Sequence, residues 1–125
     1  MKRNKYGVGI DPASIEKRTV DGIVFSSQHE AQQYISFKAL EKAGAIAKLE
    51  LQKPYQIHAI EGLHRILAPG EALMLKPICK YIADFVVTEK DGTVRVYDAK
   101  GFRTPLYRLK RKFVEAEYGI LIVEI

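Results

Sequence analysis

A strand–turn–strand pattern near the C-terminal end constrains the fold of this chain most strongly. Residues 80–88 are rich in Tyr, Ile, Phe and Val, which favour strands, and residues 93–100 have the pattern of a returning strand. Between them stands Lys90-Asp91-Gly92, a sequence typical of a tight hairpin turn. We therefore predict an antiparallel strand pair within residues 80–100.

Two stretches have the apolar spacing of amphipathic helices. The first begins at Ser26-Ser27 and ends before Gly44, and most of its apolar residues fall on one stripe. The second follows the hairpin: Thr104 can cap it, Pro105 suits its first position, and it ends at Tyr118-Gly119. Shorter apolar patterns predict a small hairpin and three further strands, at residues 20–25, 46–51, 55–60 and 120–123.

The order of these elements indicates one domain. Gly and Pro interrupt residues 61–79, which we predict to be a long loop, and residues 1–19 are predicted to be an irregular, basic N-terminal arm. Residues 20–125 then form a single domain. Helix, two or three strands, helix and strand in this order predict an α/β (α+β) fold with a mixed central sheet flanked by helices.

Composition excludes several classes of protein. The chain is 47% hydrophobic and 28% charged, as globular proteins are. No apolar run approaches the roughly 20 residues that cross a bilayer, and no signal-peptide pattern follows Met1, so we expect no membrane partner and a cytoplasmic protein. The single Cys79 excludes an internal disulfide and argues against a zinc knuckle.

Basic residues crowd the second predicted helix and the segment before it. The formal net charge is +5, which attracts polyanions but is common in proteins that bind none. Its distribution is more informative, because five cations lie close together: Arg103, Arg108, Lys110, Arg111 and Lys112. Two interpretations have equal weight, a solvated helix face and a face that contacts DNA phosphates.

Acidic residues stand on apolar faces of the predicted hairpin. Strict alternation puts Asp84 on one face with Ile82 and Val86, where a carboxylate must be paired, protonated or metal-bound. On the returning strand, Asp98 and Lys100 point the same way. Two carboxylates and an ammonium on paired strands suit a hard divalent cation and an anionic substrate. The alternative is a set of surface ion pairs that contribute little.

These residues carry a resemblance to a known superfamily. The segments Tyr81-Ile82-Ala83-Asp84-Phe85 and Val96-Tyr97-Asp98-Ala99-Lys100-Gly101 resemble the signature of the PD-(D/E)XK, or restriction-endonuclease-like, nucleases. The chain from about residue 18 onward is similar to the small phage-encoded endonucleases of that group, which resemble Holliday-junction resolvases. Further similar features are Val20-Asp21-Gly22, Ser26-Ser27 before Glu30, Leu49-Glu50-Leu51-Gln52 and the basic helix. Ala83 stands where the motif has Pro, a position without a chemical role.

The resemblance implies roles for particular residues. Asp84 and Asp98 would bind Mg²⁺ (or Mn²⁺) with the Ala99 carbonyl, and Lys100 would orient the attacking water or stabilise charge on the scissile phosphate. Glu30 has two interpretations: a metal ligand, often through water, or a capping-box residue paired with Ser27.

Other polar residues have weaker claims on the site. Gln52 is a secondary candidate that could reach it from the neighbouring strand, although polar residues commonly end strands. Tyr107, between basic residues, is expected to be a half-buried aromatic rather than a contact of nucleic acid.

The sequence therefore predicts a metal-dependent DNA endonuclease with a restriction-endonuclease-like core. By family analogy it would act on branched or structured DNA in phage replication, recombination or packaging, in the host cytoplasm if phage-encoded. A homodimer is compatible with this function, since cutting two strands symmetrically needs two active sites. The alternative is a catalytically inactive DNA-binding subunit with the same fold.

Overall fold

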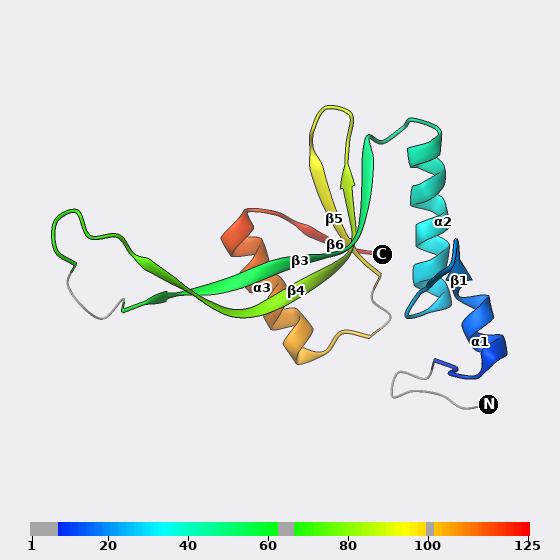
Figure 1. Cartoon of the computed structure of the whole chain (residues 1–125), viewed down its shortest axis with the longest axis horizontal. Helices are drawn as coiled ribbons and strands as arrows, with labels where there is room; N and C mark the ends of the chain where they lie inside the picture. Colours follow the sequence, from blue (N-terminus) through cyan, green and yellow to red (C-terminus); the bar gives the residue numbers. More distant parts are fainter. Residues whose placement is uncertain (1–7, 63–66, 100–101) are drawn as a thin grey trace.

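The computed structural model describes residues 8–62, 67–99 and 102–125. The elements, in chain order, are α1 Pro12–Lys17, β1 Thr19–Val20, β2 Ile23–Val24, α2 Gln28–Lys42, β3 Lys48–Glu61, β4 Met74–Thr88, β5 Val94–Asp98, α3 Pro105–Tyr118 and β6 Ile122–Glu124. Figure 1 shows α2 standing beside the sheet and α3 lying against it.

The central sheet is mixed, as the order of elements predicts. Its four strands follow the order β3-β4-β5-β6, and β1 pairs with β2 in a separate small hairpin. β3 pairs with β4, and β4 with β5, in antiparallel fashion, whereas β5 and β6 are parallel. The predicted α/β class with a mixed sheet and flanking helices is therefore confirmed.

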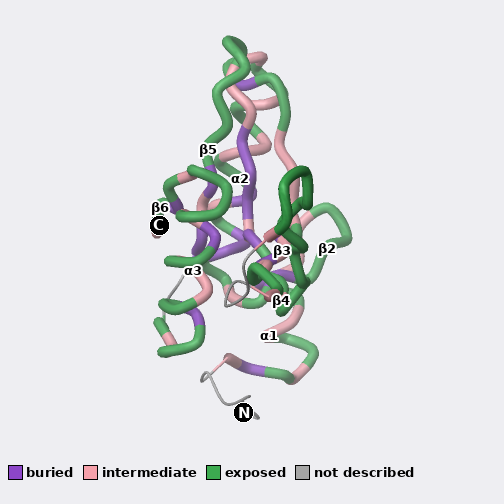
Figure 2. Tube along the Cα trace, turned by 90° about the vertical axis from the view of Figure 1, so that its left-hand side faces the viewer, coloured by how far each residue is buried: buried purple, intermediate pink, exposed green. Residues whose placement is uncertain are grey.

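The two long helices cover opposite faces of this sheet. Val86 and Val96 pack in one buried cluster with Val114 of α3, and Phe85 packs in a second cluster with Tyr34 of α2. Adjacent residues of a strand point to opposite faces, so the neighbours Phe85 and Val86 divide the core into an α3 side and an α2 side. Figure 2 shows the buried segments running through the middle of the molecule.

The helix ends follow the signals in the sequence. The Ser27 hydroxyl oxygen accepts a hydrogen bond from the Glu30 amide at 3.1 Å, and that of Thr104 accepts one from the Tyr107 amide at 3.0 Å. Gly119 ends α3 with φ of 64°, a left-handed conformation that glycine adopts without strain. Both predicted helices are confirmed.

β3 and β4 are longer than predicted and project from the body. They pair as far as Glu61 opposite Met74, while β5 covers β4 only from Phe85 to Thr88. The outer part, residues 56–62 and 67–80, is a two-stranded ribbon that we call the arm (Figure 1). Its exposed apolar side chains include Ile60, Leu73, Met74, Leu75 and Ile78.

Two predictions about irregular segments are wrong in part. Residues 74–79, predicted to be loop, belong to β4, because Pro77 lies opposite His58 where the strand register shifts and a missing amide is tolerated. The two strands predicted at 46–51 and 55–60 are one strand, β3, at the edge of the sheet, so its internal Pro54 disrupts no second neighbour.

The N-terminal segment, residues 1–19, is predicted to be irregular but contains a helix, α1. Asp11 caps α1 by accepting from the Ser14 amide at 3.3 Å, and Pro12 occupies the first turn. The basic residues Lys2, Arg3 and Lys5 lie outside the described residues. Within the described part of the chain, none of the helices is both long and apolar enough to cross a membrane.

Candidate active site

The β3–β4 ladder is irregular at the pair formed by Gln52 and Asp84. Leu51 pairs with Phe85 and Lys53 with Ala83, but the position between them is missing from the ladder. Gln52 has φ of 51°, a left-handed backbone conformation that costs a residue with a Cβ about 1–2 kcal/mol. Such strain often marks a functional position.

This irregularity changes which side chains share a face of β4. Ala83 and Val86 both pack in the α3-side cluster, although three residues of a regular strand would place them on opposite faces. The prediction that Ile82, Asp84 and Val86 lie together is therefore wrong. Ile82 is exposed, Val86 is buried, and the break in alternation lies at Asp84.

Asp84 accepts two hydrogen bonds, one from each neighbouring strand region. Its Oδ1 accepts from Gln52 Nε2 at 3.2 Å, and its Oδ2 accepts from the Ala99 amide at 2.9 Å. The second bond places this carboxylate against the backbone of the Asp98-Ala99 segment, where the sequence predicts the rest of the site.

Glu30 joins the same group from α2. The Gln52 amide nitrogen that contacts Asp84 also donates to Glu30 Oε1 at 3.2 Å. Glu30 is only 3% exposed, whereas Gln52 is exposed. The main chain of Glu30 is capped by Ser27, but its carboxylate reaches toward β3 and β4, so this residue serves both the helix end and the acidic group.

Asp98 lies in a different environment from Asp84. It is fully buried, and its Oδ2 accepts from the Tyr81 hydroxyl at 2.5 Å. Burial, then the hydrogen bond to Asp98 and the charges of Asp98 and Asp84, raise the pKa of the Tyr81 phenol. Tyr81 therefore stays protonated and lies within electrostatic reach of both carboxylates.

The structure thus brings some of the predicted site residues together. Glu30, Gln52 and Asp84 are linked by hydrogen bonds, and Ala99 joins them through its amide. Asp98 faces Tyr81 on the α3 side, and Lys100 lies outside the described residues. In the described part of the chain, no group of three or more His, Cys, Asp or Glu side chains is arranged to hold a metal ion. Convergence of Asp84, Asp98 and Lys100 on one cation stays a prediction.

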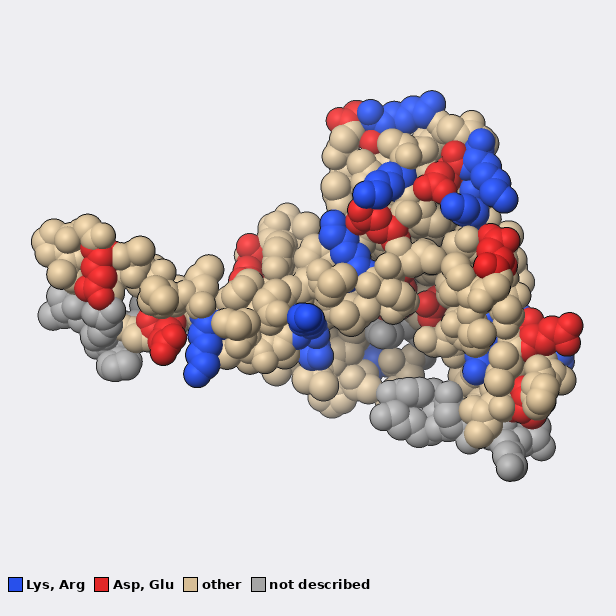
Figure 3. Space-filling view, viewed as in Figure 1, with Lys and Arg blue, Asp and Glu red and all other residues tan. Residues whose placement is uncertain are grey.

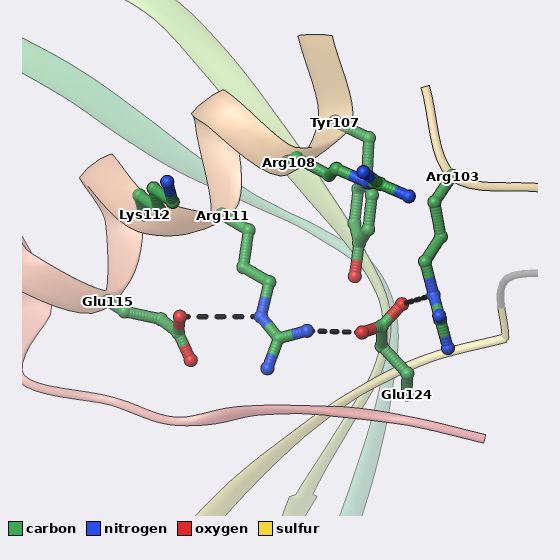
Figure 4. A pocket seen from close by; sticks show the side chains of 7 residues that line it. All are labelled: Arg103, Tyr107, Arg108, Arg111, Lys112, Glu115 and Glu124. Atoms are coloured by element: carbon green, nitrogen blue, oxygen red, sulfur yellow. Dashed lines mark hydrogen bonds and ion pairs between the residues drawn. The ribbon is translucent and has the colours of Figure 1, made fainter. Parts of the chain in front are cut away.

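A basic hollow of about 400 Å³ lies between α3 and β6 (Figure 4). The residues that line this basic hollow are Arg103, Tyr107, Arg108, Arg111, Lys112, Glu115 and Glu124. Tyr107 is 7% exposed and packs against Tyr81 with a ring distance of 6.3 Å. Burial, followed by the charges of Asp98 and Glu124, raises the pKa of Tyr107. Tyr107 therefore lines the hollow and also lies within electrostatic reach of Asp98.

The five cations predicted to bind DNA divide into two groups. Arg111 is held by Glu115 at 3.3 Å, by Glu124 and by the Ile122 carbonyl at 2.8 Å, and Arg103 also pairs with Glu124. Lys110 donates to the Lys80 carbonyl at 2.9 Å. These three have structural contacts, whereas Arg108 and Lys112 form no ion pair within the described residues.

Comparison with known proteins places the chain in a family. A family model described as "Protein of unknown function (DUF1064)" matches residues 12–124. The chain belongs to the DUF1064 family. This match spans both the acidic group and the basic hollow, so both features belong to the DUF1064 region. Searches of curated proteins and of solved structures found no match to the chain.

Sequence reasoning did not single out Tyr81 and treated Gln52 only as a secondary candidate. Tyr81 is one residue of an apolar strand, and nothing in its neighbours signals a bond to a carboxylate seventeen residues later. Glutamine seldom adopts a positive φ, so the left-handed backbone of Gln52, and the contacts that follow from it, could not be inferred from its residue type. The one signal available was Pro54, which limits strand pairing close to Gln52.

Proposed function

We propose that this DUF1064 chain is a metal-dependent DNA endonuclease of the restriction-endonuclease-like kind. The observation that carries the proposal is the linked group of Glu30, Gln52 and Asp84, hydrogen-bonded to the backbone of the Asp98-Ala99 segment. In the resembling nucleases the equivalent acidic positions bind Mg²⁺ or Mn²⁺.

The donor chemistry fits a hard divalent cation. The carboxylates of Glu30 and Asp84 and, as the resemblance implies, the Ala99 carbonyl would supply oxygen, the ligand atom that Mg²⁺ and Mn²⁺ prefer. A cation there would polarise the phosphate and lower the pKa of a bound water. Asp98, beside Tyr81, would complete the acidic shell as the resemblance implies.

Separate residues of the chain would then bind the cation, stabilise charge on the phosphate and position the DNA. Asp84 is already oriented by two hydrogen bonds, so it needs little reorganisation to hold a cation. Lys100, one residue beyond Ala99, would stabilise negative charge on the scissile phosphate. Arg108 and Lys112 would position the DNA backbone, since phosphate contacts orient a duplex without reading its sequence.

A cleavage panel tests this function. Labelled single-stranded, duplex, nicked, flapped and four-way DNA are incubated with the purified chain, with magnesium or with a chelator. We expect cleavage with magnesium and none with chelator, and the preferred substrate identifies branch specificity. Failure to cut any of these DNAs, with magnesium or manganese, would reject the nuclease.

A second candidate is a catalytically inactive DNA-binding subunit. It is favoured by the position of the Gln52 amide, whose nitrogen donates to both carboxylates at the point where a cation would lie. Salt-sensitive binding of duplex DNA without cleavage would select this function.

We also propose that the protein acts in the cytoplasm, on phage DNA if phage-encoded, and as a homodimer with two active sites. Sedimentation of the purified chain with and without four-way DNA measures the dimer, and a monomer in both states rejects it.

A further inference from the structure

One amide group links the two carboxylates of the acidic group. Gln52 Nε2 lies 3.2 Å from Glu30 Oε1 and 3.2 Å from Asp84 Oδ1. Two ionised oxygens that converge on one point repel each other, and the two N–H bonds of an amide nitrogen can satisfy both. The nitrogen therefore occupies the point at which positive charge is most favourable.

The orientation of the amide follows from the same chemistry. If the Gln52 side chain were turned by half a rotation, its carbonyl oxygen would face both carboxylates and add to the repulsion. The nitrogen must therefore face them when no cation is bound. With a cation between the carboxylates, the preference reverses, because a hard cation takes the amide oxygen and not the NH₂ group.

The place of Gln52 in the fold allows this exchange. Its side chain is exposed, while Glu30 is buried, so the amide lies on the solvent side of the carboxylate pair. Rotation about the last side-chain bond exchanges nitrogen and oxygen without moving the backbone.

We propose that Gln52 is part of the cation site, as a donor to Glu30 and Asp84 in the cation-free protein and a carbonyl-oxygen ligand once a divalent cation lies between them. The inference rests on the proposed function, since it needs a cation at this group. It adds a neutral ligand that the acidic motif does not contain, and it makes Gln52 a donor to both carboxylates when no cation is bound.

Cation affinity and thermal stability of the whole chain, without DNA, test this role. Mn²⁺ binding is measured by calorimetry, and the melting temperature is measured in chelator and in Mn²⁺. Gln52→Met keeps a side chain of similar length but neither donates nor ligates, so Mn²⁺ affinity should fall about tenfold or more. Its melting temperature in chelator should also fall, because the two carboxylates lose their shared donor.

A second variant has the opposite effect on binding. Gln52→Glu supplies oxygen and negative charge, so Mn²⁺ affinity should rise, while the melting temperature in chelator should fall further than in Gln52→Met. The matched control is Gln56→Met on the same strand, whose amide donates to the Cys79 carbonyl at 2.7 Å. This control should keep wild-type Mn²⁺ affinity.

The outcomes separate this inference from the nuclease itself. Wild-type affinity in both Gln52 variants, or an equal loss in Gln56→Met, overturns the ligand role. No Mn²⁺ binding by the wild-type chain overturns both proposals. Mn²⁺ binding that depends on Gln52 in a protein that cuts no DNA supports the cation site and rejects the nuclease.

Discussion

The acidic group and the basic hollow both gather ionisable side chains, but the contacts that link those side chains differ. At the acidic group, Glu30 and Asp84 share one neutral amide from Gln52. At the basic hollow, Glu115 and Glu124 form ion pairs with Arg111, and Glu124 also pairs with Arg103. In the acidic group the shared donor is thus neutral, whereas in the hollow acids pair directly with cations.

This difference indicates which charges are available for function. The Arg111 side chain links α3 to β6 through Glu124 and the Ile122 carbonyl. Arg108 and Lys112 have no ion pair within the described residues. On the face seen in Figure 3, acidic and basic side chains are interspersed over the body, and most of the arm is uncharged. The charges at the acidic group and at the basic hollow can each be tested separately.

The largest expected effect is on catalysis at the acidic side. Lys100→Ala and Asp98→Asn should each slow single-turnover cleavage by about 3–4 kcal/mol of transition-state stabilisation, the typical cost of one preorganised electrostatic group. Lys100→Ala should retain Mn²⁺ binding, since an ammonium is not a ligand. In Asp98→Asn the side-chain carbonyl oxygen can still accept from Tyr81, so folding should survive. Wild-type rates in both purified variants would refute the assignment.

A smaller effect is expected on stability at the basic hollow. Arg111→Met should lower the free energy of unfolding by about 2 kcal/mol, because Glu115, Glu124 and the Ile122 carbonyl lose a shared donor. Arg108→Met should change it by less than about 0.5 kcal/mol. Urea unfolding measures both, and equal values would show that the division of the cations is wrong.

For DNA binding we expect the cations without ion pairs, Arg108 and Lys112, to contribute more than Arg111 does. The double substitution of Arg108 and Lys112 by Gln should reduce the salt slope of DNA binding by about two units, one for each phosphate contact. Lys48→Gln is the control, since Lys48 pairs with Glu50 at 2.5 Å, outside the hollow. Titrations at several salt concentrations provide the slopes, and an unchanged slope in the double variant contradicts the proposed phosphate contacts.

The smallest expected effect concerns the backbone at Gln52. Gln52→Gly and Gln52→Ala both remove the amide, so their difference reports only the left-handed conformation with φ of 51°. The Gly variant should be more stable than the Ala variant by about 1 kcal/mol, because glycine adopts this conformation without steric cost. An Ala variant as stable as the Gly variant would show that the backbone is not strained there.

Much of the fold could be predicted because its signals are local. Ser27, Thr104 and Gly119 mark helix ends, and Lys90-Asp91-Gly92 marks the turn between β4 and β5. The length of the arm could not be predicted, because proline, here Pro77, is typical of the end of a strand. Its tolerance depends on a register shift opposite His58, which is a property of the paired strand.

The candidate site could be predicted only in its residue types. The pattern identifies Asp84, but strict alternation groups it with Val86, which packs on the α3 side because the alternation of β4 breaks at Asp84. The Tyr81–Asp98 hydrogen bond depends on strand pairing and burial, and neither is encoded in the spacing of the two residues. The sequence thus indicates candidate acids, while their partners depend on long-range packing.

The most direct test of the acidic group as a nuclease centre is the single-turnover rate of duplex cleavage by the wild-type chain and by Asp84→Asn. With magnesium the wild type should cut, with chelator it should not, and Asp84→Asn should bind the same DNA but cut it more slowly by a factor of about 100 or more. A wild-type chain that cuts no DNA with magnesium or manganese, or an Asp84→Asn variant that cuts at the wild-type rate, would contradict the account.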